Sequence, residues 1–349
     1  MIKLYIINMH VKEKKINKLF EYWLLISLTI VFFIIIVGGL TRLTNSGLSI
    51  IEWELLRGII PPLDHETWNF YFDKYKTIPQ YKLLNSNMKI DEFKIIFYWE
   101  YFHRILARFI GLFFFIPLIL FYLSKCIDKH YIKISFVIFS LIVIQGIIGW
   151  FMVKSGLIND VTVSHYRLSL HLSIAIIIIS TMFWLLKNIK NKKRKNFFVF
   201  SKKYLPFQIL IILILFQIVM GAFVSGLDAG KIYQSWPLMG NTFFPNDMEI
   251  NNVFDLMEFD NHSLVQFYHR LLAYIIILYV FFLTANIFKN KIKILIKPLL
   301  ILLLVLSVQV FLGIFTLISD LNIYLASGHQ ITSVLLVFSA INLYYFIAK

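Results

Sequence analysis

Cysteine is almost absent from this sequence, since Cys126 is the only one in 349 residues. A single thiol excludes an intrachain disulfide, an iron–sulfur cluster held by thiolates and a zinc site built from cysteines. Metal chemistry within the chain must therefore rest on histidine or carboxylate ligands.

Acidic residues are also scarce, with 19 Asp and Glu against 34 Lys and Arg and a formal net charge of +15. In a soluble protein this excess would suggest nucleic acid, but the basic residues crowd alternate connections between apolar runs, most densely from Lys187 to Lys203. The positive-inside rule predicts that these connections and both termini face the cytoplasm. The charge pattern thus favours a membrane and argues against nucleic acid.

Apolar residues make up 59% of the chain and recur in runs long enough to cross a hydrocarbon core of about 30 Å. Eight such runs lie at about 20–40, 95–123, 133–153, 165–186, 205–224, 264–288, 297–318 and 323–347. The sequence therefore predicts an all-α membrane protein with eight transmembrane helices.

The second half of the chain repeats the pattern of the first. Gly221 aligns with Gly38, His269-Arg270 with His103-Arg104, Gln309 and Gly313 with Gln145 and Gly149, and His329 with His171. We expect two tandem four-helix bundles of the same orientation, each with an even number of spans. The expected segments are a cytoplasmic tail (1–19), a first half (20–186), a basic linker (187–204) and a second half (205–349).

Four histidines occupy matching places in the two halves: His103, His171, His269 and His329. Each lies about six to eight residues into a span that runs inward, hence roughly 10 Å below the predicted outer boundary. Equal depth suits a planar macrocycle clamped between imidazoles of two helices, so we predict two haem sites with these histidines on the iron. The alternatives are histidines that only bond neighbouring helices, and a zinc or copper site; the latter lacks a His-x-x-x-His motif and a carboxylate cluster.

His165 is a fifth histidine near a predicted site. It precedes His171 by six residues, about 240° around a helix, so the two cannot share one ligand face. We expect His171 to be the ligand and His165 an interfacial side chain.

Cations on the predicted outer side could meet haem propionates, although basic residues otherwise favour the inner side. The candidates are Arg42, Arg104, Arg108, Arg167 and Arg270. Arg167 lies one turn outward of His171 on the same face. Arginines that reach toward lipid headgroups are the alternative, chiefly for Arg42 and Arg167.

Glu100 marks a difference between the halves. It precedes His103 by three residues, while the equivalent residue in the second half is Gln266. A carboxylate beside one site and an amide beside the other suggests proton chemistry in the first half only. The alternative is a structural ion pair between Glu100 and Arg104.

Several motifs together resemble the haem A synthase family. They are Gly38-Gly39-Leu40-Thr41-Arg42-Leu43-Thr44 with Gly47-Leu48-Ser49, Glu100-Tyr101-Phe102-His103-Arg104, Gly226-Leu227-Asp228-Ala229-Gly230 with Trp236-Pro237-Leu238-Met239, and His329-Gln330. The likeness covers nearly the whole chain. It is closest to the bacterial and mitochondrial branch, because the cysteine pair found in the first outer loop of other members is missing here.

The resemblance implies an oxidoreductase of the bacterial inner membrane. Such enzymes oxidise the C8 methyl of haem O to a formyl group, by successive hydroxylations and loss of water, and so supply haem A to cytochrome c oxidase. Carried over to this chain, Glu100 is the catalytic carboxylate, His103 and His171 flank the substrate haem, and His269 and His329 hold haem B. Candidate partners beyond membrane lipid are haem O synthase, cytochrome oxidase assembly factors and a second copy of the chain.

Two other functions are compatible with the histidine pattern. One is a dihaem b-type membrane electron carrier that modifies no haem, and the other is a haem transporter or chaperone. Glu100, the loop motifs and the family likeness favour the enzyme.

Overall fold

The structure is a computed structural model that describes residues 2–54, 57–159, 161–248, 250 and 252–349; Met1, the first residue of the expected tail, lies outside them. The described residues form helices and connections, without a strand. Eight helices are long and apolar enough to cross a membrane, which confirms the predicted fold class. They are α1 (Ile2–Leu43), α4 (Ile90–Ser124), α5 (Lys129–Asn159), α6 (His165–Lys190), α7 (Leu205–Gly226), α8 (His262–Lys289), α9 (Ile296–Ile318) and α10 (Ile323–Ile347).

The chain is a multi-pass membrane protein, because its long helices combine high hydropathy with apolar surfaces that no other helix covers. Leu120, Phe281 and Leu304 are each more than 60% exposed on these helices. Such a continuous apolar exterior would aggregate in water and is stable against lipid.

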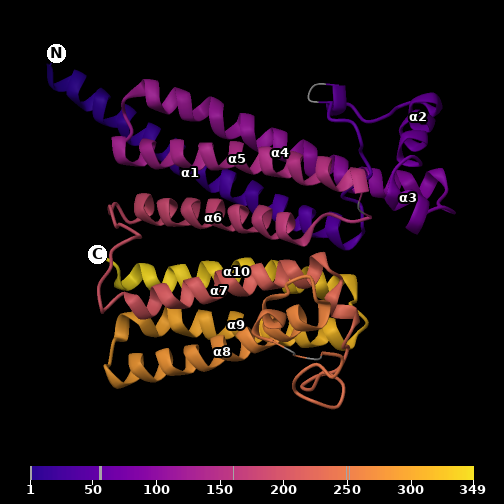
Figure 1. Ribbon diagram of the computed structural model, residues 1–349. Helices are drawn as coiled ribbons and strands as arrows, with labels where there is room; N and C mark the ends of the chain where they lie inside the picture. The colour runs from indigo at the N-terminus through magenta and orange to yellow at the C-terminus, as the bar shows by residue number, and fades with distance from the viewer. Residues whose placement is uncertain (1, 55–56, 160, 249, 251) are drawn as a thin grey trace.

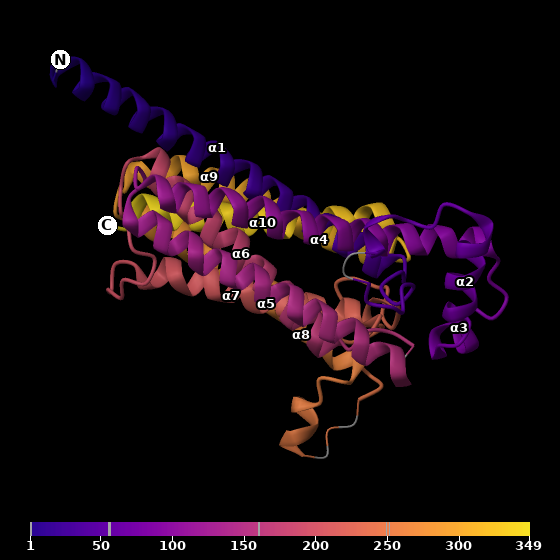
Figure 2. The same cartoon turned by 90° about the horizontal axis from the view of Figure 1, so that it is seen from above.

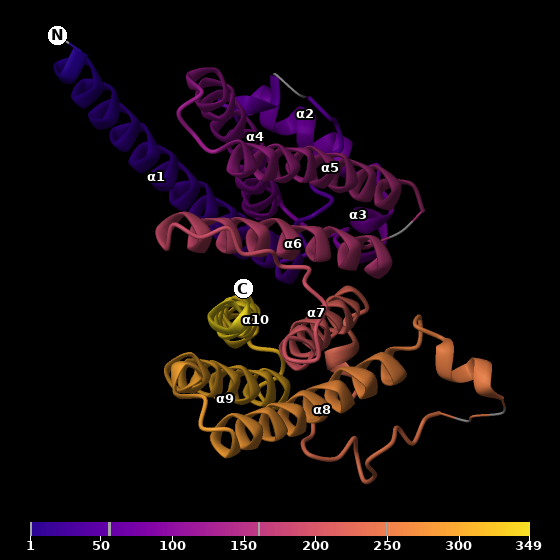
Figure 3. The ribbon, with the colours of Figure 1, turned by 90° about the vertical axis from the view of Figure 1, so that its left-hand side faces the viewer.

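The helices form two groups that pack against each other (Figure 1). One group holds α1, α4, α5 and α6, and the other holds α7 to α10. Contacts between α1 and α6 close the first group and contacts between α7 and α10 close the second. Helices α6 and α7, with α1 and α10, join the groups, so α4 and α8 lie at the periphery (Figure 3).

Long connections gather at one end of the bundle, which we call the loop end; it comprises residues 44–89 and 227–261. The first connection holds η1 (Arg57–Ile59), α2 (His65–Tyr75) and α3 (Pro79–Leu84), and the second holds η2 (Ala229–Lys231) and η3 (Val253–Met257). At the opposite end the connections are shorter, η4 (Lys293–Leu295) lies between α8 and α9, and the first part of α1 projects beyond the bundle (Figure 2).

Two helices are longer than their apolar runs. Helix α1 begins at Ile2 rather than near residue 20, so residues 2–19 continue the first span as helix. Helix α4 begins at Ile90, where the Glu92 side chain accepts a hydrogen bond from the backbone N–H of Lys89 at 2.8 Å. The added turn of α4 carries Phe93, which is fully buried against Trp68, Phe72 and Tyr75 of α2. Packing against the connection therefore extends this helix beyond its apolar run.

Candidate functional site

The four histidines meet in two pairs. The ring centres of His103 (α4) and His171 (α6) lie 6.5 Å apart with 66° between the ring planes. Those of His269 (α8) and His329 (α10) lie 6.4 Å apart at 81°. The tandem repeat has thus placed one facing imidazole pair of nearly equal spacing in each group of helices.

Each of these imidazoles lies against a glycine of the preceding long helix, and we call this contact a glycine seat. A Cβ added at Gly38, Gly149 or Gly313 would stand 2.8–2.9 Å from Cε1 of its histidine, and one at Gly221 would stand 3.1 Å away. The partners are Gly38 with His103, Gly149 with His171, Gly221 with His269 and Gly313 with His329. At Gly38, Gly149 and Gly313 a side chain would force a shift, since real Cβ contacts below 3.0 Å are essentially never seen, and the contact at Gly221 is tighter than nine in ten real ones.

The pairs have the donor chemistry and spacing that a haem iron requires. A metal–imidazole bond is about 2 Å long, so two imidazoles on opposite sides of one metal have ring centres roughly 6 Å apart. The Nδ1 atoms of His103, His171 and His269 are buried and lack a hydrogen-bond partner. Among the described residues no group of three or more His, Cys, Asp and Glu side chains could hold a metal ion. The donor set is therefore two imidazoles per site, which fits bis-histidine ligation of haem.

His165 lies apart from both pairs, between the two groups of helices. Its ring packs edge-on against Phe223 of α7, and its Nε2 is 3.4 Å from a carboxylate oxygen of Asp260. A Cβ on Gly226 would meet the Cβ of His165 at 2.5 Å. His165 thus fills the junction between α6 and α7.

Glu100 is buried, and both of its carboxylate oxygens have partners. One oxygen pairs with Arg104 at 2.5 Å. The other accepts hydrogen bonds from Ser49 Oγ at 2.7 Å and from the backbone N–H of Ile50 at 2.9 Å. The ion pair foreseen as an alternative from the sequence is present within α4. Glu100 and Arg104 also hold the first connection onto this helix, through their hydrogen bonds to Ser49 and Ile50.

In the second half the equivalent residues, Gln266 and Arg270, bind the connection between α7 and α8. There the side chain at the Glu100 position acts as a hydrogen-bond donor instead of an acceptor. Gln266 donates to the backbone carbonyl of Tyr233 at 2.9 Å, where Glu100 accepts from an N–H. Arg270 donates to the carbonyls of Tyr233 and Ser235, both at 2.9 Å. The difference between carboxylate and amide therefore also matches the backbone group that each one binds.

The remaining arginines at the loop end also have protein partners. Arg42 pairs with Asp228 at 3.1 Å and donates to carbonyls at the end of α7. Arg108 donates to the carbonyl of Glu54 at 3.0 Å. Arg167 donates to Ser155 Oγ at 2.5 Å and lies over the Phe151 ring. Buried Nε donors without a partner remain on Arg42, Arg108 and Arg270.

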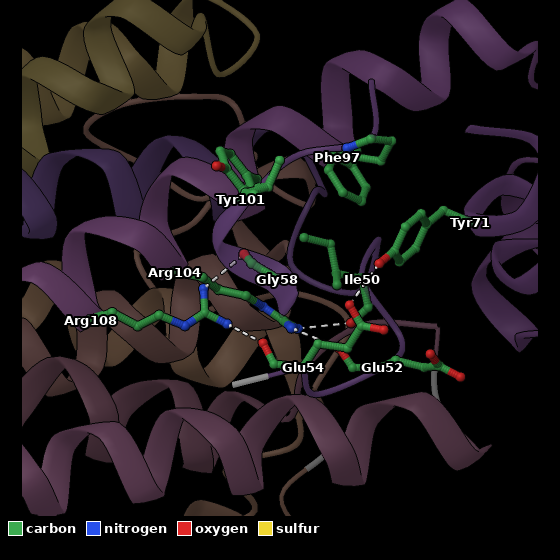
Figure 4. Close-up of a pocket in the computed structure, with 11 residues that line it drawn as sticks. Ile50, Glu52, Glu54, Gly58, Tyr71, Phe97, Tyr101, Arg104 and Arg108 are labelled. Atoms are coloured by element: carbon green, nitrogen blue, oxygen red, sulfur yellow. Dashed lines mark hydrogen bonds between the residues drawn. The ribbon is translucent and has the colours of Figure 1, made fainter. Parts of the chain in front are cut away.

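A small pocket lies between α4 and the first connection (Figure 4). Arg104 and Arg108 form its cationic wall and point their guanidinium groups at backbone carbonyls of the connection, and both lie within 6.0 Å of the exposed Trp53 ring. The pocket is lined by Ile50, Glu52, Glu54, Gly58, Ile60, Pro62, Tyr71, Phe97, Tyr101, Arg104 and Arg108. The pocket wall thus combines two arginines with the acidic residues Glu52 and Glu54.

Comparison with known proteins identifies the family. The sequence profile of the COX15-CtaA family, described as cytochrome oxidase assembly protein, matches residues 21–341. This chain belongs to the COX15-CtaA family. The resemblance found in the motifs is thereby confirmed.

Curated relatives of this COX15-CtaA protein carry the name heme A synthase. The one from Pelagibacter ubique is 45% identical over 333 residues, covering 95% of this chain and 97% of the relative. Those from Rickettsia felis and Nitrosospira multiformis are each 40% identical and cover 95% and 93% of this chain, and 99% and 92% of their own length.

The structure also contains contacts in this COX15-CtaA protein that sequence reasoning missed. The glycine seats are the main example, although the repeat alignment had already set Gly221 on Gly38 and Gly313 on Gly149. A second example is the Arg42–Asp228 ion pair between the halves. The available signal was the recurrence of a glycine at one register in all four helices that precede a histidine helix.

Proposed function

We propose that this protein is a haem A synthase, an oxidoreductase that converts the C8 methyl group of haem O into a formyl group and so yields haem A for cytochrome c oxidase. The observation that carries the proposal is the presence of two facing histidine pairs in a COX15-CtaA chain. Nearly full-length relatives named heme A synthase support it.

The two pairs take different roles in this proposal. His103 and His171 bind the iron of the substrate, haem O, while His269 and His329 bind haem B as a resident cofactor. Haem B supplies one-electron transfer when bound. The glycine seats position all four imidazoles, because each ring is confined against a helix backbone.

Residues at the loop end orient the substrate and handle protons. Arg104 and Arg108 bring positive charge to the side of His103 where haem propionates would lie, and Arg42, Arg167 and Arg270 give the remaining cationic surface. Glu100 is the candidate catalytic carboxylate, which exchanges a proton during oxidation of the methyl group. Its ion pair with Arg104 keeps the carboxylate in place between turnovers.

The proposed setting is the bacterial inner membrane, which the family resemblance implies. The charge pattern supports an orientation with the basic connections and termini in the cytoplasm and the loop end outside. Haem O synthase and cytochrome oxidase assembly factors are candidate partners, and a second copy of the chain is another.

Pigment extraction from the purified full-length protein tests the proposal. The protein is expressed in a host that makes haem O, and acid extracts are separated and identified by mass spectrometry. Haem B together with haem O or haem A supports the enzyme. Haem B alone would instead support a dihaem electron carrier, and a haem-free protein that binds no added haem would exclude both.

A further inference from the structure

Three of the four seated histidines have a second support one turn before the glycine. Gln145 Nε2 donates to the backbone carbonyl of His171 at 3.0 Å, and Gln217 Nε2 donates to that of His269 at 3.0 Å. Gln309 Nε2 lies 3.4 Å from the His329 ring. We call each of these contacts a glutamine brace.

The fourth seat lacks this brace. The residue four before Gly38 is Ile34, which packs among apolar side chains of the core. Within the described residues no side-chain hydrogen bond reaches His103, and its Nδ1 is buried without a partner. His103 therefore lacks the glutamine contact, and beyond its glycine seat the backbone carbonyl of Ile34 lies near its ring.

Position in the bundle does not explain the difference. The equivalent helices α4 and α8 both lie at the periphery, and each packs mainly against two other long helices, α1 and α5 for α4 and α7 and α9 for α8. Gln217 ties α8 to α7 at His269. In the described part of the chain no glutamine side chain ties α4 to α1 at His103, and a side-chain hydrogen bond between these helices lies one turn away, from Thr41 Oγ1 to the Trp99 carbonyl at 3.2 Å. Polar bonds between membrane helices resist their separation, and outer contacts of a metal ligand typically change metal affinity 10- to 100-fold.

We propose that His103 is the exchangeable ligand of this protein: its imidazole leaves the iron first, while His171, His269 and His329 stay attached. This inference rests on the proposed function, which assigns a haem to each pair. The bond broken is the coordinate bond from His103 to iron; its electron pair stays on the imidazole, and an external ligand donates its own pair instead. The weakly held ligand thus belongs to the pair whose haem must enter and leave.

Carbon monoxide binding to the dithionite-reduced full-length protein tests this inference. Visible spectra report binding, and pyridine haemochrome assays report haem content independently of activity. In the native chain we expect carbon monoxide to bind one haem per chain. Ile34→Gln, which supplies the missing brace, should weaken that binding at least about tenfold with haem content unchanged.

Matched variants assign the effect to the braces. Gln145→Ile loosens the other ligand of the same haem and should strengthen binding there. Gln217→Ile imitates the Ile34 arrangement in the second half and should make the second haem reactive, which still tests the idea should Ile34→Gln not fold. If the protein carries haem but neither Ile34→Gln nor Gln217→Ile alters carbon monoxide binding, this inference is wrong, while the proposed function is unaffected. A native protein without haem would overturn the proposed function itself.

Discussion

Gly149 lies directly against the imidazole of His171, and a Cβ at Gly149 would stand 2.9 Å from Cε1 of that ring. Gly149→Ala should therefore push His171 away from His103 and lower the haem content of the first half severalfold, because overpacking a tight contact typically costs about 1–3 kcal/mol. Pyridine haemochrome assays on purified protein measure the loss.

Gly146→Ala is the matched control on the same helix, since a Cβ there meets nothing within 4 Å. Alanine favours a helix by up to about 1 kcal/mol over glycine, so both variants gain the same backbone term. Equal haem contents in the two variants would show that the seat does not position the ligand.

Arg42 joins the halves by donating to the last carbonyls of α7, at Ser225 and Gly226, as well as to Asp228. A cation at a helix C-terminus satisfies free carbonyls and the helix dipole. Arg42→Met should lower the free energy of unfolding by about 1–3 kcal/mol, because those carbonyls lose a charged donor. Asp228→Asn should cost under about 1 kcal/mol, since the Asp228 side chain is 41% exposed. Denaturant unfolding in detergent, followed by circular dichroism, compares them, and equal losses would contradict this account.

The sequence was sufficient to predict the eight spans, because a span needs only length and hydropathy. Helix boundaries were harder to predict: α4 begins five residues before the expected start because Phe93 packs against α2. That packing depends on how the first connection folds, and its mixed composition carries no simple period.

The candidate site, too, was predictable from sequence in part only. Repeat alignment and helix depth anticipated that His103 would face His171 and His269 would face His329, since both follow from helix geometry. The glycine seats depend on the rotation of neighbouring helices, which the alignment does not fix. The arginines were counted as cations for haem propionates, and that role stays a prediction; their contacts with connection carbonyls, such as Arg104 with Ile50 at 2.8 Å, could not be read from sequence.

Tyr71 of α2 reports on the order of the first connection. Burial, together with its hydrogen bond to Glu54, raises the pKa of Tyr71 to about 12 from an ordinary value of 10.0. Because the pKa is higher in the folded protein, the stabilisation is complete below pH 10 and disappears as the pH rises through about 12. The difference in phenolate absorbance between native protein and Tyr71→Phe should therefore titrate near pH 12, and Glu54→Gln should move that transition down. A difference titration centred at pH 10 in the native protein would contradict the contact.

Variants of Glu100 and of its partner Ser49 distinguish a catalytic role of Glu100 from a role in holding the first connection. Glu100→Gln keeps the size of the side chain but removes the negative charge, so we expect haem content to persist while haem A formation falls about 10²- to 10⁴-fold, the usual range for loss of a proton-transfer group. Ser49→Ala removes one hydrogen bond to the same carboxylate at 2.7 Å and leaves the carboxylate in place, so its haem A output should stay within a few fold of native. Extracted haems from membranes of both variants give the measurement. If Ser49→Ala is as damaging as Glu100→Gln, or if Glu100→Gln makes haem A at the native level, Glu100 serves to hold the connection and the proton passes elsewhere.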